Sequence, residues 1–285
     1  MGLGVKVKGR VEYPNGLKLH VNDQSSIVED AAMLGNNNVA EVATVSEVTT
    51  EVSDQLESGE GDSNTKFKNK SYWNSRFSSE DVYDWLVEFR HVAPQITDHL
   101  RLDDRILTVG CGNSSFSYEL YQLGYRNIVN IDYSEVVIDN MAKKYGDIAP
   151  EMQWLVMDMT NMSFGNSSFD VIIDKAAMDA LVVDEGDVWH PSQHVIDIVD
   201  KMCTEVSRVM TSTGEFIQIS FAQPHFRTKY LMGHHISKST LDYYRSYEGR
   251  STVYDWMLSF ETISKEGGSL DTFLYLMSRK ELASS

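Results

Sequence analysis

Short apolar runs alternate with segments of helical periodicity between residues 105 and 221, and this alternation constrains the fold more than any other feature. Five runs are predicted to be buried strands, at residues 105–110, 127–132, 152–159, 169–175 and 215–221. Three segments are predicted to be helices, at residues 114–124, 134–145 and 193–210. Strands that alternate with helices form a mostly parallel sheet with helices on both faces, so the sequence predicts an α/β fold.

The end of the chain departs from this alternation. Residues 252–260 and 272–280 are both strand-like, and the link between them contains the turn residues Gly267 and Gly268. This pattern predicts an antiparallel hairpin. Together with the five preceding strands, it predicts a seven-stranded sheet that ends in an antiparallel pair.

Residues 1–65 differ in composition from the rest of the chain. Between Val21 and Thr65 there are ten Asp or Glu residues, no Lys or Arg, and no aromatic residue. Such a segment buries too little apolar area to offset its ordering entropy, so we expect a disordered extension. The alternating Val and Lys between Gly4 and Leu19 are nevertheless compatible with a strand. We place the folded domain at residues 66–285.

Aromatic residues become frequent where the folded domain begins. Residues 79–100 are predicted to form an amphipathic helix that Ser79 caps and that has Trp85 and Phe89 on its apolar face. Pro94 is expected to kink or divide this helix because proline lacks the amide hydrogen that helix propagation needs.

The formal net charge is −17. Phosphate binding needs a basic surface, so we expect no direct nucleic-acid partner; the acidity fits a basic protein substrate, or simple solubility. No apolar run is long enough to span a bilayer, and the segment from Met1 to Arg10 lacks the apolar core of a secretory signal. Cys111 and Cys203 have no metal-ligand spacing. We therefore expect a cytoplasmic monomer with no membrane partner and no metal.

A glycine-rich turn joins the first strand of the alternation to the helix after it. Its sequence is Val109-Gly110-Cys111-Gly112-Asn113-Ser114. Gly110 and Gly112 permit positive φ and allow a ligand to approach the backbone closely. Such a turn occurs in nucleotide-type sites, but it can equally be a tight strand-to-helix connection. No GxxxxGK[ST] sequence occurs, which excludes a P-loop.

Carboxylates end the next two strands. Asp132 can accept hydrogen bonds from both hydroxyls of a ribose, or it can cap the helix that begins near Ser134. Asp158 and Met159 can contact an adenine, through its amino group and its ring respectively, or they can be a loop carboxylate and a core methionine. Since ligands bind at the carboxyl ends of strands in open α/β sheets, we expect a site at this edge.

Two cofactors that contain adenosine, NAD and S-adenosylmethionine, could fit this predicted site. The NAD fingerprint requires a third glycine at position 115, where this chain has Ser115. NAD enzymes also lack a C-terminal antiparallel hairpin of this kind. S-adenosylmethionine contains no pyrophosphate, so the shorter glycine loop suffices for it. We therefore predict S-adenosylmethionine as the cofactor.

Motifs along the chain resemble one enzyme family. They are YWNSRF at residues 72–77, YDW at 83–85, ILTVGCGNSSFSYELY at 106–121, NIVNIDYSEVVI at 127–138, MDMTNMSF at 157–164, SFDVIIDK at 168–175, EVSRVM at 205–210 and PHFRTKY at 224–230. Together they resemble the eukaryotic lysine methyltransferases that act on translation elongation factor 1-alpha, in particular subtype 4 and the N-terminal half of methyltransferase-like protein 13. The resemblance covers residues 72–280.

The resemblance implies a Rossmann-like class I methyltransferase fold and a protein-lysine N-methyltransferase that uses S-adenosylmethionine. It implies that Trp73, Phe77 and Trp85 form an aromatic lid over the cofactor and that Gly110 lies beside its methionine moiety. It also implies that Asp132 and Tyr133 contact the ribose and adenine and that Asp158 and Met159 contact the adenine. Lys175 is implied to lie near the carboxylate end of the cofactor. Ordinary packing of an N-terminal helix would also account for the three aromatic residues.

The substrate side departs from the family. Members follow the Asp-Lys pair with Gly-Thr-Leu-Asp-Ala, whereas this chain has Ala176-Ala177-Met178-Asp179-Ala180. The departure leaves substrate identity open. Asp174 and Asp179 are candidates to attract an incoming lysine ammonium, unless Asp179 caps a helix or forms a salt bridge. His225, Arg227 and Lys229 follow the fifth strand, either at the substrate mouth or at a solvated helix start.

Three functions are compatible with the sequence. The first is a protein-lysine methyltransferase acting on elongation factor 1-alpha. The second is a small-molecule methyltransferase of the same fold, and the third is a weakly active scaffold that binds the cofactor. The intact glycine loop and Asp132 argue against the scaffold.

Overall fold

The computed structural model describes residues 10–12, 18–20, 64–233, 249–263 and 271–279. The chain divides into two compact units, Met1–Glu60 and Gly61–Ser285. In the first unit, β1 (Arg10–Glu12) and β2 (Lys18–His20) pair antiparallel, in the region where the sequence is compatible with a strand. Most of the predicted extension 1–65 lies outside the described residues, so its disorder stays a prediction.

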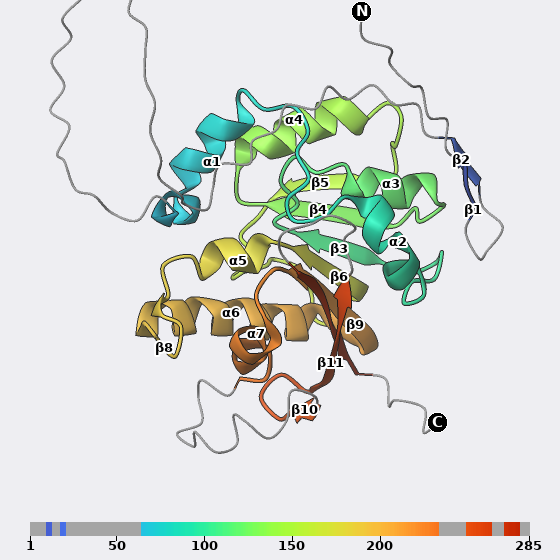
Figure 1. Cartoon of the computed structure of the whole chain (residues 1–285). Coiled ribbons are helices and arrows are strands. Elements are labelled where there is room, and N and C mark those ends of the chain that lie inside the picture. Colours follow the sequence, from blue (N-terminus) through green and yellow to red (C-terminus); the bar gives the residue numbers. More distant parts are fainter. Residues whose placement is uncertain (1–9, 13–17, 21–63, 234–248, 264–270, 280–285) are drawn as a thin grey trace, which may run out of the picture. The chain divides into compact units, whose positions relative to one another are not determined.

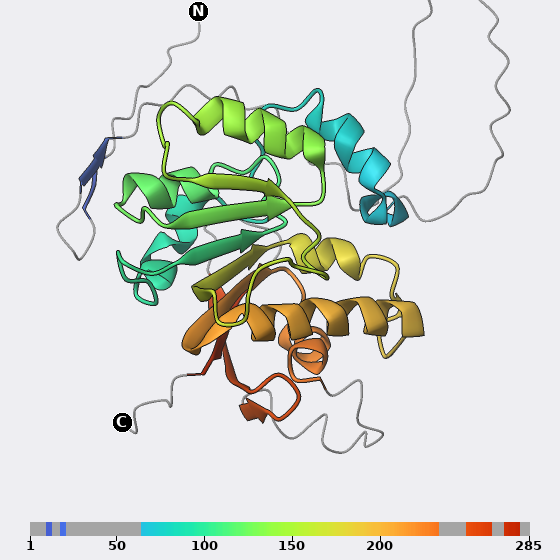
Figure 2. The same cartoon turned by 180° about the vertical axis from the view of Figure 1, so that it is seen from behind.

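The second unit contains an eight-stranded sheet (Figures 1 and 2). Its strands are β3 (Ile106–Val109), β4 (Ile128–Asp132), β5 (Gln153–Val156), β6 (Phe169–Lys175), β9 (Met210–Ser220), β10 (Gly249–Ser251), β11 (Trp256–Ile263) and β12 (Thr272–Ser278). The order across the sheet is β10-β11-β12-β9-β6-β3-β4-β5, and the last five strands in this order are parallel to one another. They overlap the five predicted runs, which confirms the α/β fold.

Helices cover both faces of this sheet. The helices of this unit that the structure describes are the 3-10 helix η1 (Thr65–Lys68) and the α-helices α1 (Lys70–Phe77), α2 (Phe89–Thr97), α3 (Phe116–Gln122), α4 (Glu135–Tyr145), α5 (Ala177–Leu181), α6 (Gln193–Val209) and α7 (Pro224–Leu231). Figures 1 and 2 view the molecule from opposite sides; α3 lies in front of the sheet in the first and α6 in the second. Within the described residues, no helix is long and apolar enough to cross a membrane.

One large cluster of buried apolar side chains lies between the sheet and α6. All four residues of β3 are buried, as expected for a central strand with helices on both faces. The buried face of α6 repeats at helical spacing and consists of Val195, Val199, Met202, Cys203, Val206 and Val209. These side chains belong to one cluster with Ile172 of β6 and Phe216 of β9. The apolar periodicity of residues 193–210 therefore predicted the buried face correctly.

The antiparallel part of the sheet confirms the predicted C-terminal hairpin. Strand β12 pairs antiparallel with β11 on one side and with β9 on the other. Strand β10 adds a short eighth strand beside β11, which the sequence did not predict. The link that contains Gly267 and Gly268 lies outside the described residues.

The predicted helix over residues 79–100 is wrong in its first half. Helix α2 begins only at Phe89, and Pro94 lies inside it without dividing it. The preceding segment is irregular, and Leu86 has a φ of +69°. Polar side chains of this segment contact the glycine loop: Glu80 accepts a hydrogen bond from Asn113 at 3.0 Å. These long-range contacts outweigh the local helical periodicity.

Candidate functional site

A cavity of about 420 Å³ lies at the carboxyl ends of the parallel strands. Segments that follow β3, β4, β5 and β6 form its floor, and residues of η1, α1 and the segment before α2 form its cover. Every predicted cofactor-contacting residue lines it, namely Trp73, Phe77, Trp85, Gly110, Gly112, Asp132, Tyr133, Asp158, Met159 and Lys175. The structure thus brings these ten residues together, while their roles toward a cofactor stay predictions.

The two glycines of the loop have the backbone conformation expected from the sequence. Gly110 has a φ of +56° and Gly112 a φ of +52°, a region that disfavours residues with a side chain. A Cβ atom at position 110 would also overlap the Cβ of Ala177. Gly110 is therefore required both by its φ and by the close approach of α5, whereas Gly112 is required by its φ.

Asp132 lies at the floor of the cavity and is 5% exposed. Its Oδ2 accepts the amide hydrogen of Gly112 at 3.0 Å and its Oδ1 accepts that of Ser134 at 2.9 Å. Burial raises the pKa of this carboxyl to about 6, because the backbone donors offset desolvation only in part. Ser134 itself caps α4 through the amide of Val137. Asp132 therefore supports the helix start and faces the cavity as well.

Asp158 and Met159 form the wall that follows β5. The Oδ1 of Asp158 accepts the amide and the hydroxyl hydrogens of Thr160, both at 2.8 Å. This contact fixes an exposed carboxylate in a turn. The half-buried Met159 lies beside Gly110, and Tyr133 is half-buried on the neighbouring wall. The two residues give this part of the cavity an apolar and aromatic lining.

The aromatic cover is a cluster of packed rings. Trp73 stacks on Phe77 with 5.5 Å between ring centroids and meets Trp85 edge-on at 5.8 Å. Phe67, which lies 5.7 Å from Trp85, extends the cluster. The guanidinium of Arg76 lies over Trp85 at 4.7 Å. The indole N–H of Trp85 is buried and has no hydrogen-bond partner among the described residues.

Lys175 ties this cover to the end of β6. Its side chain is 6% exposed, and its Nζ donates to the Oδ1 of Asp84 at 3.2 Å and to the carbonyl of Trp85 at 3.0 Å. Burial lowers the pKa of this ammonium, although the carboxylate of Asp84 opposes the shift. Asp84 also accepts hydrogen bonds from the hydroxyls of Ser114 and Ser115. The segment before α2 is therefore fixed to both β6 and the glycine loop.

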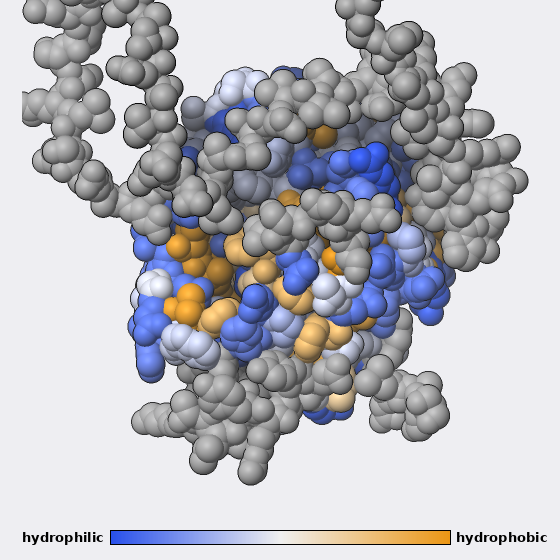
Figure 3. Space-filling view, in the orientation of Figure 1, coloured by the Kyte–Doolittle hydropathy of each residue, from blue (hydrophilic) through white to orange (hydrophobic). Residues whose placement is uncertain are grey.

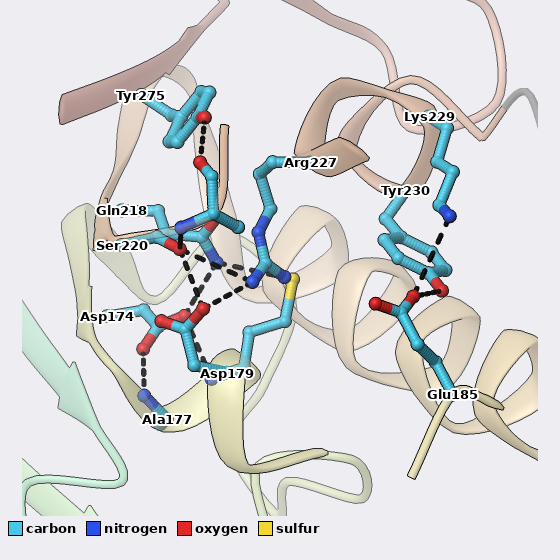
Figure 4. A network of polar contacts seen from close by, with 12 residues as sticks. Asp174, Ala177, Asp179, Glu185, Gln218, Ser220, Arg227, Lys229, Tyr230 and Tyr275 are labelled. Carbon is cyan, nitrogen blue, oxygen red and sulfur yellow. Dashed lines mark hydrogen bonds and ion pairs between the residues drawn. The ribbon is translucent and has the colours of Figure 1, made fainter. Parts of the chain in front are cut away.

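The two candidates for attracting an acceptor ammonium belong to a network of polar contacts (Figure 4) and are not among the residues that line the cavity. Asp174 is fully buried and accepts hydrogen bonds from the amide of Ala177 and the side chain of Gln218, both at 2.7 Å. Asp179 accepts from the Nη2 of Arg227 at 2.5 Å. The alternative considered from the sequence, a salt bridge at Asp179, is the arrangement observed. Both carboxylates hold α5 in place from behind the cavity.

Arg227 lies neither at an open mouth nor at a solvated helix start. It is 1% exposed, and its Nε and Nη1 have no partner within the described residues. Lys229 is buried as well. The charged positions of α7 thus face inward, which their sequence spacing did not indicate.

Several cavity residues were not predicted as site residues. They are Phe67 and Lys68 of η1, Asp184 after α5, and His194 and Ile198 at the start of α6. Phe67 belongs to the aromatic run that marks the start of the folded domain, so a signal for it existed. Asp184 lies in a segment without periodicity, whereas His194 is an exposed polar position at the start of the helix predicted over residues 193–210. Only the path of the chain between β6 and α6 brings these two residues to the cavity.

A family model described as a methyltransferase domain matches residues 101–268. EEF1A lysine methyltransferase 4 of Bos taurus is 33% identical over 224 residues, which are 77% of this chain and 79% of that protein. The eEF1A lysine and N-terminal methyltransferase of Mus musculus is 36% identical over 174 residues, 60% of this chain and 24% of that protein.

The solved structure of the N-methyltransferase NodS from Bradyrhizobium japonicum aligns with a TM-score of 0.48 and 14% identity, covering 76% of this chain and 100% of that chain.

Proposed function

This chain belongs to the methyltransferase-domain family, in the group that contains EEF1A lysine methyltransferase 4, and on this premise we propose that it methylates a lysine of translation elongation factor 1-alpha with S-adenosylmethionine. The family assignment rests on the matched domain and on a relative that is covered over most of its length. The cofactor and the substrate protein are the proposed parts.

The chemistry of the cavity wall supports the cofactor. Asp132 presents carboxylate oxygens, which suit the hydroxyl donors of a ribose. Tyr133 and Met159 offer apolar surface to an adenine. The unpartnered indole N–H of Trp85 and the buried ammonium of Lys175 are donors that suit a carboxylate. A volume of about 420 Å³ lies within the usual range for small-molecule sites.

The single observation that carries the proposal is the convergence of these donors and acceptors on one cavity. S-adenosylmethionine supplies an electrophilic methyl group when bound. The chain itself contributes position and exclusion of water, because the aromatic rings of Trp73, Phe77 and Trp85 cover the cavity. An apolar wall also disfavours the charged form of an entering lysine amine, which promotes its deprotonation before transfer.

The substrate class follows from the relatives and from charge. The two mammalian relatives described above are named for lysine methylation of elongation factor 1-alpha. A net charge of −17 on this chain favours association with a basic partner. We place this activity in the cytoplasm, where translation elongation takes place, and expect the enzyme to act as a monomer.

The direct test is a transfer assay with purified components. The full chain is incubated with methyl-labelled S-adenosylmethionine and purified elongation factor 1-alpha, and the modified lysine is located by mass spectrometry of peptides. With S-adenosylmethionine near the wild-type Kd, we expect label on one lysine for the wild type and far less label for an Asp132→Asn variant. Label that appears only in small molecules of a lysate, or no label at all, would overturn the proposal.

A further inference from the structure

The short hairpin between α5 and α6 is an exposed structure next to the cavity. It consists of β7 (Gly186–Asp187) and β8 (His190–Pro191), which pair antiparallel. We propose that this hairpin is the docking surface for the lysine-bearing segment of the protein substrate, with Trp189 as its anchor. The proposal rests on the proposed function, because it concerns the partner of the same site.

The hairpin lies at the rim of the cavity because the chain on either side of it lines the cavity. Asp184, two residues before β7, and His194, three residues after β8, both line the cavity. A bound segment that contacts the hairpin would therefore reach the cavity within a few residues of chain. Figure 3 shows apolar surface over α5 and the adjoining end of α6, next to this hairpin in the orientation of Figure 1.

Helix α7 holds the hairpin in place through buried side chains (Figure 4). Lys229 donates from Nζ to the carbonyl of Val188 and lies 3.6 Å from the carboxylate of Glu185. Tyr230 donates its hydroxyl hydrogen to the same carboxylate at 2.6 Å. A hairpin with two-residue strands is not stable by itself, so these contacts define its position. A surface that is rigid before binding loses less conformational entropy on association.

Trp189 occupies the turn of the hairpin and is 52% exposed. Its ring stacks near His225 with 6.1 Å between centroids and meets Phe226 edge-on at 5.2 Å. Both partners belong to α7, which also holds the rest of the hairpin. Tryptophan is one of the residue types enriched among the few residues that dominate the binding energy of protein interfaces. Trp189 is exposed, and its ring is held in a fixed orientation by α7.

The charges around the hairpin specify the partner as a lysine-bearing segment. The carboxylate of Asp184 already binds an ammonium, that of Lys68 at 2.5 Å, and each of these side chains is 46% exposed. An exposed ion pair contributes about 1 kcal/mol or less, so a substrate lysine can replace Lys68 at small cost. Asp187 adds a second exposed carboxylate, which lies 2.9 Å from the Nδ1 of the exposed His190. Acidic groups at the rim repel phosphates, which disfavours a nucleic acid here.

The test compares steady-state kinetics of the wild type and a Trp189→Ala variant, with purified elongation factor 1-alpha as the probe. We expect the KM for the protein substrate to rise at least tenfold, with kcat within twofold and an unchanged Kd for S-adenosylmethionine. Ile148→Ala is the matched control. Ile148 is also an exposed large apolar residue, but it lies between α4 and β5, before the amino end of β5, whereas the cavity lies at the carboxyl ends of the strands.

The outcomes separate the two proposals. No transfer by the wild type would overturn the proposed function and the docking role with it. Transfer with an unchanged KM in the Trp189→Ala variant would overturn the docking role alone, as would an equal rise in KM for the Ile148→Ala control. If sedimentation shows that Trp189→Ala converts a wild-type dimer into a monomer while KM stays the same, the hairpin serves self-association and the docking proposal is wrong.

Discussion

Ala176 allows a stability prediction that follows from one dihedral angle. It joins β6 to α5 and has a φ of +70° and a ψ of −1°, the left-handed region that disfavours residues with a Cβ atom. Its amide donates to the carbonyl of Ile219 at 3.1 Å, which holds this conformation. We therefore expect an Ala176→Gly variant to be more stable than the wild type.

The magnitude is the difference between two opposing effects. Removing the Cβ from a left-handed residue relieves about 1–2 kcal/mol. Glycine also increases the conformational freedom of the unfolded chain, which costs about 0.4–1 kcal/mol. The net gain in unfolding free energy is about 0.5–1 kcal/mol. For a folded unit of this size, that corresponds to a rise in Tm of about 2–3 °C.

The assay is thermal unfolding of the full chain, followed by circular dichroism without ligand. Ala177→Gly is the matched control, because the neighbouring alanine is the first residue of α5 and has no left-handed φ. We expect the control to lose about 0.5–1 kcal/mol, since glycine is unfavourable in a helix. A lower Tm for Ala176→Gly than for the wild type would refute the reasoning.

Three further predictions concern charged groups. Asp132→Asn should raise the Kd of S-adenosylmethionine about 100-fold, because two hydrogen bonds to a carboxylate contribute about 3 kcal/mol together; calorimetry with an unchanged Kd would contradict the ribose assignment. Arg227→Met should lower the unfolding free energy in urea by about 3–5 kcal/mol, because it leaves Asp179 buried without its cation, and the paired Arg227→Met/Asp179→Leu variant should regain most of that loss. The hydrogen bond from His99 to Glu215, with 3.1 Å between Nδ1 and Oε2, raises the pKa of the histidine. The contribution of this hydrogen bond to the free energy of unfolding is therefore complete below the unfolded pKa of about 6.5 and is lost as pH rises through the folded pKa. The difference in unfolding free energy between wild type and His99→Gln should therefore be larger at pH 6 than at pH 8.

The strands and the glycine loop could be predicted because the residue types within each segment determine their conformation. The run Ile106–Val109 contains three large apolar residues and Thr108, without the polar alternation of a strand that has one solvated face, which is typical of a strand with both faces covered. Gly110 marks a positive φ that other residues disfavour. Predictions of this kind need no knowledge of distant residues.

The segment before α2 and the buried pair at α7 could not be predicted, because distant partners determine them. Asp84 is held by Lys175 from the end of β6, and this contact replaces the helix that the apolar periodicity indicated. Arg227 is buried because Asp179, far away in sequence, supplies its counter-charge. A single sequence does not show which charged residues pair, and most charged residues lie on solvated surfaces, so the burial of Arg227 could not be expected from its residue type.

The position of β12 has a consequence for how the protein reaches its native state. This strand comes last among the described elements, yet it lies between β9 and β11 and supplies hydrogen bonds to both. While residues 272–278 are still inside the ribosome, β9 and β11 both lack their shared neighbour. The sheet can therefore be completed only after β12 has been synthesised, and a truncation that removes β12 would leave a gap between β9 and β11.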